Sequence, residues 1–324
     1  MVKLASAEMA EKKLATRAAF GATLAELAEE GVPVVAVDAD LTGSTTTKKF
    51  AAAAPENADK LFNCGIAEQN MIDVAAGLAL TGHVAYTGSF AVFGTGRAYD
   101  QIRNTVCYSN LDVKICPTHA GVSVGPDGGS HQMLEDVSLM RGLPNMRVLV
   151  PADYAAARAA IKLAAKTPGP VYVRMGRAAV PCVYDDDVEL ELGCAYVLRE
   201  GTDATVVACG VEIREALAAA DALAEEGISI EVIDAFSVKP LDEDTITASV
   251  AKTGCCVVAE EHSVHGGLGS AVAECLARKN PAPCEFVGVQ DRFGKSGEFE
   301  ELLGYFNLDA AAIVEAVKRA RGRK

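Results

Sequence analysis

The sequence predicts an α/β fold with two domains, each a mostly parallel sheet covered by helices. The first observation is length, because 324 residues correspond to about two domains of ordinary size. The second is that short apolar runs alternate with helical patterns, as in parallel sheets covered on both faces. The third is a break at the acidic stretch CVYDDDVELELG, residues 182–193, which reads as a linker or an edge strand. We therefore predict a first domain over residues 1–190 and a second over 191–324.

The elements of both domains follow from the apolar pattern. A helix over residues 5–30 should end at Gly31, because glycine commonly terminates helices. Short runs rich in branched side chains predict buried strands. The predicted strands cover 33–37, 84–87, 113–115, 147–150, 171–174, 204–208, 228–233, 255–259 and 286–289. The other predicted helices cover 68–80, 152–166, 212–226 and 308–321.

Composition excludes several classes of protein. The formal net charge of −14 argues against a general affinity for nucleic acid or anionic membranes. The ten cysteines form no CxxC pair and only five histidines are present, so a zinc finger or ribbon is not expected. No apolar stretch approaches the ~18 residues of a membrane span, and the N-terminus lacks the apolar core of a secretory signal. We expect a cytoplasmic protein whose cysteines are mostly buried.

Glu68 opens a strongly apolar predicted helix in the segment FNCGIAEQNMIDVAAGLAL. A carboxylate at this position can complement the positive end of the helix dipole. It can also lie against an apolar wall and serve as an acid or base, because burial favours the protonated carboxyl. The spacing leaves both interpretations open.

The segment THAGVSVGPDGGSHQ, residues 118–132, is called the histidine loop below. It follows a predicted strand and carries His119, Asp127 and His131. Its four glycines allow close approach of the backbone to a ligand, and long loops in compact domains are commonly functional. A plain solvent-exposed loop is the alternative. A metal site is less favoured because only one carboxylate lies between the histidines.

Two further segments also follow predicted strands. Phe90 and Phe93, three residues apart, can pack in the core or form a stacking wall for an aromatic cofactor. Arg174 and Arg177 stand where guanidinium groups suit a phosphate or carboxylate, or form surface ion pairs. The stretch EEHSVHGGLGSAVAE predicts a tight turn before a packing helix, and the absence of GxxxxGK[ST] leaves phosphate-loop hydrolysis unsupported.

Together these segments resemble the pyrimidine-binding and C-terminal domains of the transketolase family over nearly the whole chain. The most specific parts are GIAEQNM, SFAVFGTGRAYDQIR and the H-x7-D-x3-H pattern of the histidine loop. The resemblance implies a thiamine-diphosphate-dependent enzyme of the pentose phosphate pathway. Such an enzyme transfers a two-carbon ketol unit from a ketose phosphate to an aldose phosphate.

The resemblance also implies roles for individual residues. Glu68 matches the helix-starting glutamate that contacts the cofactor's aminopyrimidine, so it is predicted to be catalytic, as is His131. Phe90 and Phe93 match the aromatic pocket around that ring, and Asp40 matches an acidic residue near the thiazolium. The residues that match substrate and phosphate contacts are Arg17, Ser44, His119, Asp127, His131 and Arg177.

Two departures from the family pattern have consequences. The family often carries a third aromatic residue three positions after the second phenylalanine, and here that position is Gly96. A full transketolase is about twice as long and binds the diphosphate through a divalent metal at a GDG…N motif, and this sequence has no GDG. The resemblance therefore implies the C-terminal subunit of a split transketolase, with no metal ligand in this chain. A separate N-terminal subunit would carry that motif and bind the magnesium or calcium ion. Self-association through the pyrimidine-binding and C-terminal domains is also implied, so the expected assembly is a heterotetramer.

Three alternative functions are considered beside this one. A deoxyxylulose-phosphate synthase fits GRAYDQ well but normally occurs as one long chain. A two-oxoacid dehydrogenase β-subunit has a similar length, but its usual motif lacks the H-x7-D-x3-H loop. A non-enzymatic half that only scaffolds a partner is disfavoured because Glu68, Asp127 and both loop histidines are present.

Overall fold

A seven-stranded sheet forms the centre of the first half of the chain in the computed structural model, which describes residues 2–324. Its order is β12-β6-β7-β5-β4-β2-β3, and every pairing is parallel except that of β12 with β6. The strands are β2 (Val34–Asp38), β3 (Leu61–Asn63), β4 (Val84–Gly88), β5 (Val113–Ile115), β6 (Arg147–Leu149), β7 (Val171–Val173) and β12 (Ser237–Lys239). The predicted mostly parallel sheet is confirmed.

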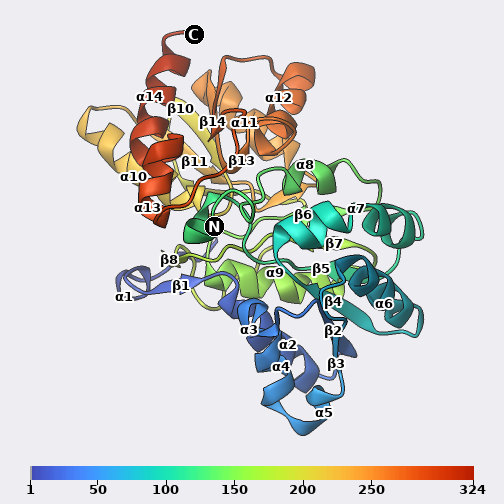
Figure 1. Cartoon of the computed structure of the whole chain (residues 1–324). Helices are drawn as coiled ribbons and strands as arrows, with labels where there is room; N and C mark the ends of the chain where they lie inside the picture. Colours follow the sequence, from blue (N-terminus) through green and yellow to red (C-terminus); the bar gives the residue numbers. More distant parts are fainter. Residues whose placement is uncertain (1) are drawn as a thin grey trace.

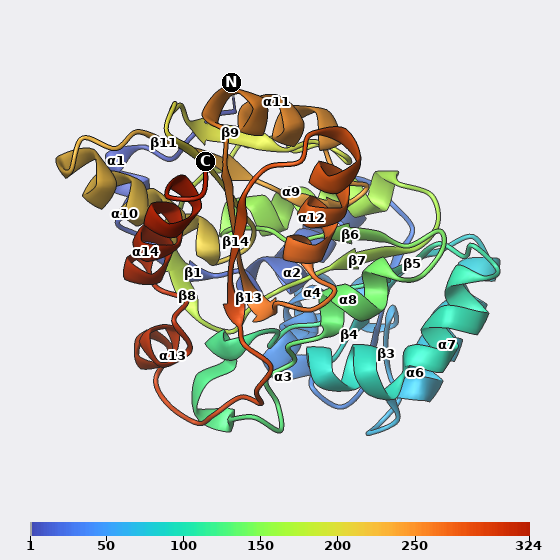
Figure 2. The same ribbon diagram turned by 90° about the horizontal axis from the view of Figure 1, so that it is seen from above.

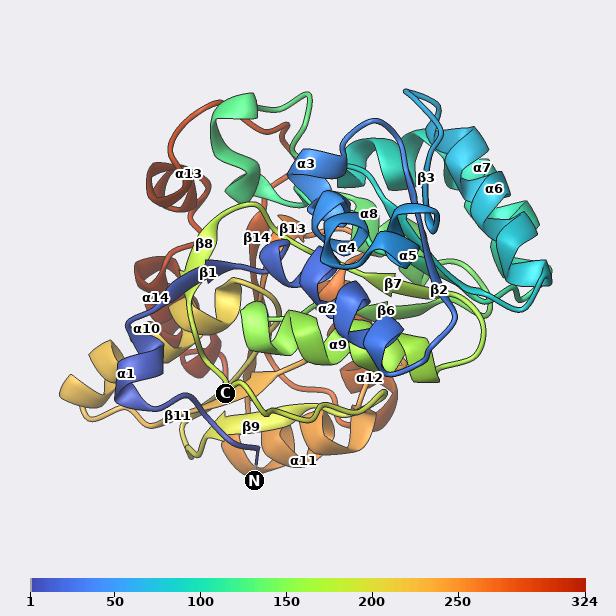
Figure 3. The same ribbon diagram turned by 90° about the horizontal axis from the view of Figure 1, so that it is seen from below.

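Helices cover both faces of this sheet because side chains of each strand alternate between two apolar clusters. One face packs on α2 (Ala18–Glu29) and α9 (Tyr154–Lys166), and the other packs on α6 (Glu68–Leu80). Figure 3 shows α2, α4 (Thr47–Ala53) and α9 together on the first of these faces. The remaining helices of this half are α3 (Thr42–Thr45), α5 (Pro55–Ala58), α7 (Tyr99–Gln101) and α8 (Asp136–Arg141), with η1 (Val92–Arg97), η2 (Ile102–Cys107) and η3 (Val122–Asp127).

The predicted helix over residues 5–30 is wrong in its first half. Only a single turn, α1 (Ala7–Ala10), forms there, followed by the strand β1 (Lys13–Ala15). β1 pairs antiparallel with β8 (Ala179–Pro181), so a pairing partner far along the chain overrides the local helical pattern. The end of the helix is confirmed, since α2 stops before Gly31, whose φ is +82°.

A five-stranded sheet of order β14-β13-β10-β11-β9 forms the second half. Its strands are β9 (Tyr196–Arg199), β10 (Ala204–Ala208), β11 (Ile230–Asp234), β13 (Cys256–Ser263) and β14 (Cys284–Val289), of which only β9 pairs antiparallel. The helices are α10 (Glu212–Glu225), α11 (Glu243–Thr253), α12 (Leu268–Lys279), α13 (Phe299–Phe306) and α14 (Ala310–Arg321). Figure 1 shows this half stacked above the first. The predicted turn before a packing helix is confirmed at α12.

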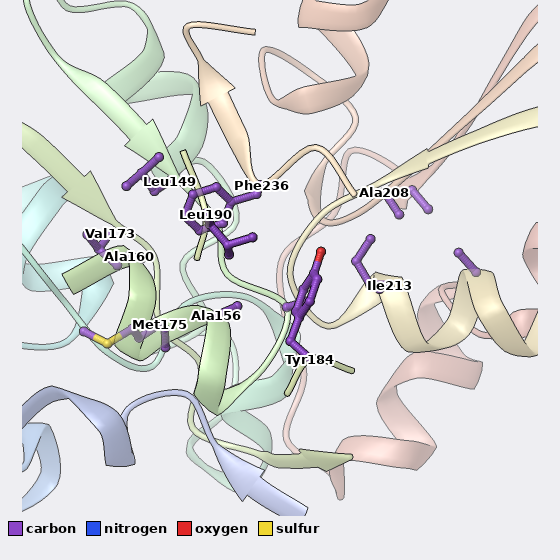
Figure 4. Close-up of a cluster of buried hydrophobic side chains, with 14 of the residues drawn as sticks. Leu149, Ala156, Ala160, Val173, Met175, Tyr184, Leu190, Ala208, Ile213 and Phe236 are labelled. Carbon is purple, nitrogen blue, oxygen red and sulfur yellow. The ribbon is translucent and has the colours of Figure 1, made fainter. Parts of the chain in front are cut away.

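The two halves share a core. Figure 4 shows Leu149 of the first sheet near Phe236 of the second half, and Tyr184 of the connecting segment beside Ile213 of α10, all within one apolar cluster. The acidic stretch therefore forms no regular strand but a connection whose apolar side chains are buried. The strand β12 also lies past residue 190 yet pairs with β6 of the first sheet. The boundary at residue 190 remains a prediction.

Candidate active site

Four neighbouring strands, β7, β5, β4 and β2, run parallel and end at one edge of the seven-stranded sheet. A predicted site residue follows each end: Arg177 after β7, His119 after β5, Phe90 after β4 and Asp40 after β2. Ligands of open α/β sheets bind beyond the carboxyl ends of the strands. The order of strands therefore gathers residues that lie far apart in sequence.

Two phenylalanines and two histidines form a cluster at this edge. The His119 ring stacks on Phe90 with centroids 3.8 Å apart, and the Phe93 and His131 rings meet edge-on at 5.5 Å. Phe90 and Phe93 lie 6.2 Å apart with nearly parallel planes. Both phenylalanines thus lie at the strand-end site, where the stacking-wall interpretation places them.

His119 is held in an unusual setting. It is 2% exposed, its φ is +61°, and its Nδ1 lies 2.7 Å from the hydroxyl of Thr118. Burial, together with the nearby charges of Arg17 and Arg177, lowers its pKa to about 3. The imidazole is therefore neutral at pH 7 and carries one N–H that can donate to a substrate oxygen.

Arg17 and Arg177 lie close enough to influence each other. Burial lowers the pKa of Arg17, the charge of Arg177 lowers it further, and Asp127 acts in the opposite direction. Arg17 Nη1 donates to the backbone oxygen of Ser44 at 2.8 Å, and Arg177 Nη1 donates to that of Val124 at 2.6 Å. Two guanidinium groups whose charges repel each other, each fixed by a bond to a backbone oxygen, suit the binding of an anion.

Glu68 is the first residue of α6 and is only 2% exposed. It therefore combines both features considered from the sequence, a helix start and a buried carboxyl group. Arg97 Nη1 lies 2.9 Å from Glu68 Oε2, and the Arg97 guanidinium lies 4.6 Å from the centroid of the Phe93 ring. Arg97 thus joins Glu68 to the aromatic cluster.

Arg97 is the last residue of the π-helix η1, which also contains Gly96. Gly96 is the position where the family often carries a third aromatic residue. A π-helix accommodates one extra residue in a turn and is frequent at functional sites. The side chain of Arg97 remains 49% exposed. The sequence shows this arginine but gives no sign that it covers Phe93.

Three predicted residues stand apart from the aromatic–histidine cluster. Asp40 is exposed with φ of +64°, and its carboxylate accepts a bond from Asn63 Nδ2 at 3.3 Å. Ser44 contributes its backbone to Arg17, and Asp127 is exposed at the end of η3. Within residues 2–324, no hydrogen bond connects Asp40 or Asp127 to the cluster.

Arg174 does not offer a free guanidinium to an anion. It is 5% exposed, with Nε 2.7 Å from Asp136 Oδ2 and Nη1 3.3 Å from Glu261 Oε1. Burial alone would lower its pKa, but these two carboxylates raise the pKa above its ordinary value. The alternative of a surface ion pair is wrong as well, because this pair is buried.

The described residues offer no ready metal site. Across residues 2–324, no group of three or more His, Cys, Asp or Glu side chains is arranged to hold an ion. Over the same range, no helix combines the length and apolarity needed to cross a bilayer. All ten cysteines are free, and seven of them are buried, as predicted.

Family models match most of the chain. The transketolase pyrimidine-binding domain matches residues 12–183, and the transketolase C-terminal domain matches residues 193–313. The chain belongs to the transketolase family. The predicted resemblance is thereby confirmed, and the two-domain architecture of this transketolase chain agrees with both models.

Similar proteins include separate transketolase subunits. A transketolase C-terminal section of Methanocaldococcus jannaschii is 45% identical over 93% of this chain and 94% of that protein. A 6-deoxy-6-sulfo-D-fructose transketolase subunit of Clostridium sp. is 42% identical over 93% of this chain and 92% of that one. A solved structure described as a split-gene transketolase in an inactive β4 tetramer has a TM-score of 0.87 and 48% identity, covering 96% of this chain and 99% of that one.

Proposed function

We propose that this chain is the C-terminal subunit of a cytoplasmic, thiamine-diphosphate-dependent transketolase acting on sugar phosphates of the pentose phosphate type. The reaction would transfer a two-carbon ketol unit from a ketose phosphate to an aldose phosphate. The observation that carries the proposal is the convergence at one sheet edge of a buried carboxyl group, an aromatic pair, two histidines and two arginines.

The residues at this edge fit the aminopyrimidine part of the cofactor. The buried Glu68 carboxyl pairs with Arg97, and Arg97 lies over Phe93, whose ring can stack on another aromatic ring. Glu68 would hold a proton against a ring nitrogen, and Phe90 and Phe93 would fix the plane of the ring. When bound, thiamine diphosphate supplies an acidic carbon that becomes the nucleophile. We assign the diphosphate and its magnesium or calcium ion to a partner subunit, with Asp40 facing the thiazolium.

The histidines and arginines would act on the sugar. The neutral His119 and the half-buried His131 would donate to carbonyl and hydroxyl oxygens whose charge changes during the reaction. Arg17 and Arg177 would bind the dianionic phosphate away from the reacting carbon, with Ser44 beside them. Asp127 would accept a bond from the hydroxyl next to the carbonyl, which favours one stereochemistry.

Reconstitution tests the proposal. The purified chain, thiamine diphosphate, magnesium, xylulose 5-phosphate and ribose 5-phosphate should give no turnover until an N-terminal subunit carrying GDG…N is added. The inactive β4 assembly described for a similar split transketolase supports this expectation. Turnover by this chain alone would refute the split-enzyme proposal, and a measured mass equal to two copies of each subunit would support a heterotetramer.

A second candidate substrate class comes from the Clostridium relative, whose name specifies a sulfonated ketose. A sulfonate is an anion that the same two arginines could bind. The reconstituted enzyme should be assayed with fructose 6-phosphate and with 6-deoxy-6-sulfofructose as donors. A higher kcat/KM for the sulfonate would replace the sugar-phosphate assignment.

A further inference from the structure

The second half of the chain holds the histidine loop from two sides. On one side, Glu261 of β13 accepts two hydrogen bonds from Ser123. The backbone N–H of Ser123 donates to Oε2 at 3.0 Å, and the hydroxyl of Ser123 donates to Oε1 at 3.1 Å. Glu261 and Ser123 are 3% and 2% exposed, so water does not compete for these bonds.

On the other side, the segment after β14 packs against the same loop. Gln132 Nε2, in a side chain that is 4% exposed, donates to the backbone oxygen of Lys295 at 2.9 Å. A methyl group at Gly129 would approach the backbone oxygen of Gly294 to 2.7 Å, and one at Gly128 would collide with Ser296. The loop glycines therefore serve close contact between the two halves. Figure 2 shows the segment between β14 and α13 running beside η3.

The held loop carries residues of the proposed substrate site. His119 and His131 lie near its two ends, with Asp127 between them. Arg177 also donates to Val124 in the middle of the loop. A shift of the loop would therefore move both histidines, the carboxylate and one arginine together.

Charge neutralisation alone does not account for Glu261. Arg174 already has a two-point contact with Asp136, through Nε at 2.7 Å and Nη2 at 3.2 Å. Removing Glu261 would leave the buried Arg174 paired with one carboxylate rather than two. Glu261 Oε1 also lies 3.3 Å from Arg174 Nη1, but each of its two oxygens accepts a hydrogen bond from Ser123. The contact that Glu261 makes and Asp136 does not is therefore the one with the loop.

We propose that the C-terminal domain positions the histidine loop, with Glu261 and Gln132 as positioning residues for substrate binding. The proposal rests on the function proposed above, since it gives the loop its substrate. It assigns the second domain a part in the site in addition to any part in assembly.

The test compares Glu261→Ala and Glu261→Gln with Tyr184→Phe. Tyr184 donates to Asp234 at 2.6 Å, so Tyr184→Phe removes a buried bond between the same two halves away from the histidine loop. In the assembled enzyme we expect Glu261→Ala to lower kcat/KM for ribose 5-phosphate by about 10- to 100-fold, the scale of a misplaced site. Glu261→Gln, which keeps one acceptor, should recover part of this loss. Tyr184→Phe should lower the melting temperature without changing kcat/KM.

Hydrogen–deuterium exchange of the isolated chain gives a readout independent of activity. Glu261→Ala should speed exchange in peptides covering residues 120–132, and Tyr184→Phe should not. Unchanged exchange in the Glu261 variants would overturn the proposal. Faster exchange with unchanged kinetics would also overturn it, because the loop would be held for stability alone. An inactive wild-type assembly would refute the proposed function, and exchange would still decide whether Glu261 holds the loop.

Discussion

The two sheets have the same architecture but use their carboxyl edges differently. In the seven-stranded sheet, the ends of β2, β4, β5 and β7 carry the candidate active site. In the five-stranded sheet, the corresponding ends contact the first half of the chain. Glu261 at the end of β13 binds Ser123, Asp234 at the end of β11 binds Tyr184, and Gly210 after β10 donates to Val150 at 3.3 Å.

The difference shows that the carboxyl ends of parallel strands do not by themselves identify a ligand site. Parallel strands leave polar groups and loop starts at their carboxyl ends, and these can bind a ligand or another domain. Here the edge of the seven-stranded sheet gathers the candidate site residues and is called the open edge. The edge of the five-stranded sheet packs against protein and is called the filled edge. The predictions below test each edge in turn.

The largest expected effect concerns Asp234 at the filled edge. Burial raises its pKa to about 7, partly offset by the bond from Tyr184. The folded state thus retains a proton that the unfolded state releases near pH 4. The contribution of Asp234 to stability should therefore be fully present below pH 4 and be lost as the pH rises through 7, by on the order of 4 kcal/mol at most. Asp234→Asn should lack this component.

Urea unfolding of the wild type and Asp234→Asn between pH 4 and 8 measures the difference, since other titrations cancel. Asp185→Asn is a suitable control, because Asp185 is an acidic residue of the neighbouring segment whose partner is Lys3 at the surface. If the difference in unfolding free energy between the wild type and Asp234→Asn did not change with pH, the pKa of Asp234 would not be raised in the folded state.

The next effect concerns Glu68 at the open edge. Glu68→Gln keeps the shape but removes the acidic proton, so the assembled enzyme should lose at least ~100-fold in kcat, the usual scale of acid–base contributions. The affinity for thiamine diphosphate should change less, because the diphosphate is assigned to the partner. Asp73→Asn, an exposed change on the same helix, should leave kcat unchanged. If Glu68→Gln and Asp73→Asn changed kcat equally, Glu68 would serve only to complement the dipole of α6.

The sequence predicts most of the residues that lie at the open edge of the seven-stranded sheet. It predicts few of the contacts at the filled edge of the five-stranded sheet. Phe90, His119 and Arg177 could be found because each follows a short apolar strand whose pattern is local. Ser123 and Glu261 lie 138 residues apart, and no spacing rule joins them. Their pairing depends on how the two sheets stack, which is decided by the shared core.

The incorrect predictions from the sequence also arise from contacts between distant parts of the chain. The stretch before α2 has a helical pattern but becomes β1 because β8 lies beside it. Arg174 follows a strand as Arg177 does, yet Asp136 and Glu261 bury it in ion pairs. In both cases, a partner distant in sequence overrides a local signal.

A smaller effect should separate phosphate binding from the rest of the open edge. Arg17→Ala and Arg177→Ala should each raise the apparent KM for ribose 5-phosphate by about 10-fold, as expected for a lost bond to a charged group. The KM for glycolaldehyde, which has no phosphate, should barely change. Each variant also removes one bond to a backbone oxygen, that of Val124 for Arg177 and that of Ser44 for Arg17, so glycolaldehyde is the control for both. If Arg17→Ala weakened both acceptors equally, its role would be structural.

The smallest expected effect concerns Arg97, which covers Phe93 and pairs with Glu68. A guanidinium on this ring competes with a stacking pyrimidine for the same face. Arg97→Ala should therefore lower the apparent KM for thiamine diphosphate by about threefold to fivefold, the scale of a cation–π contact made by a partly exposed arginine. Arg103→Ala, an exposed arginine bonded to Asn104, is the control. A higher KM in Arg97→Ala would instead make Arg97 the residue that closes the pocket in place of an aromatic side chain at Gly96.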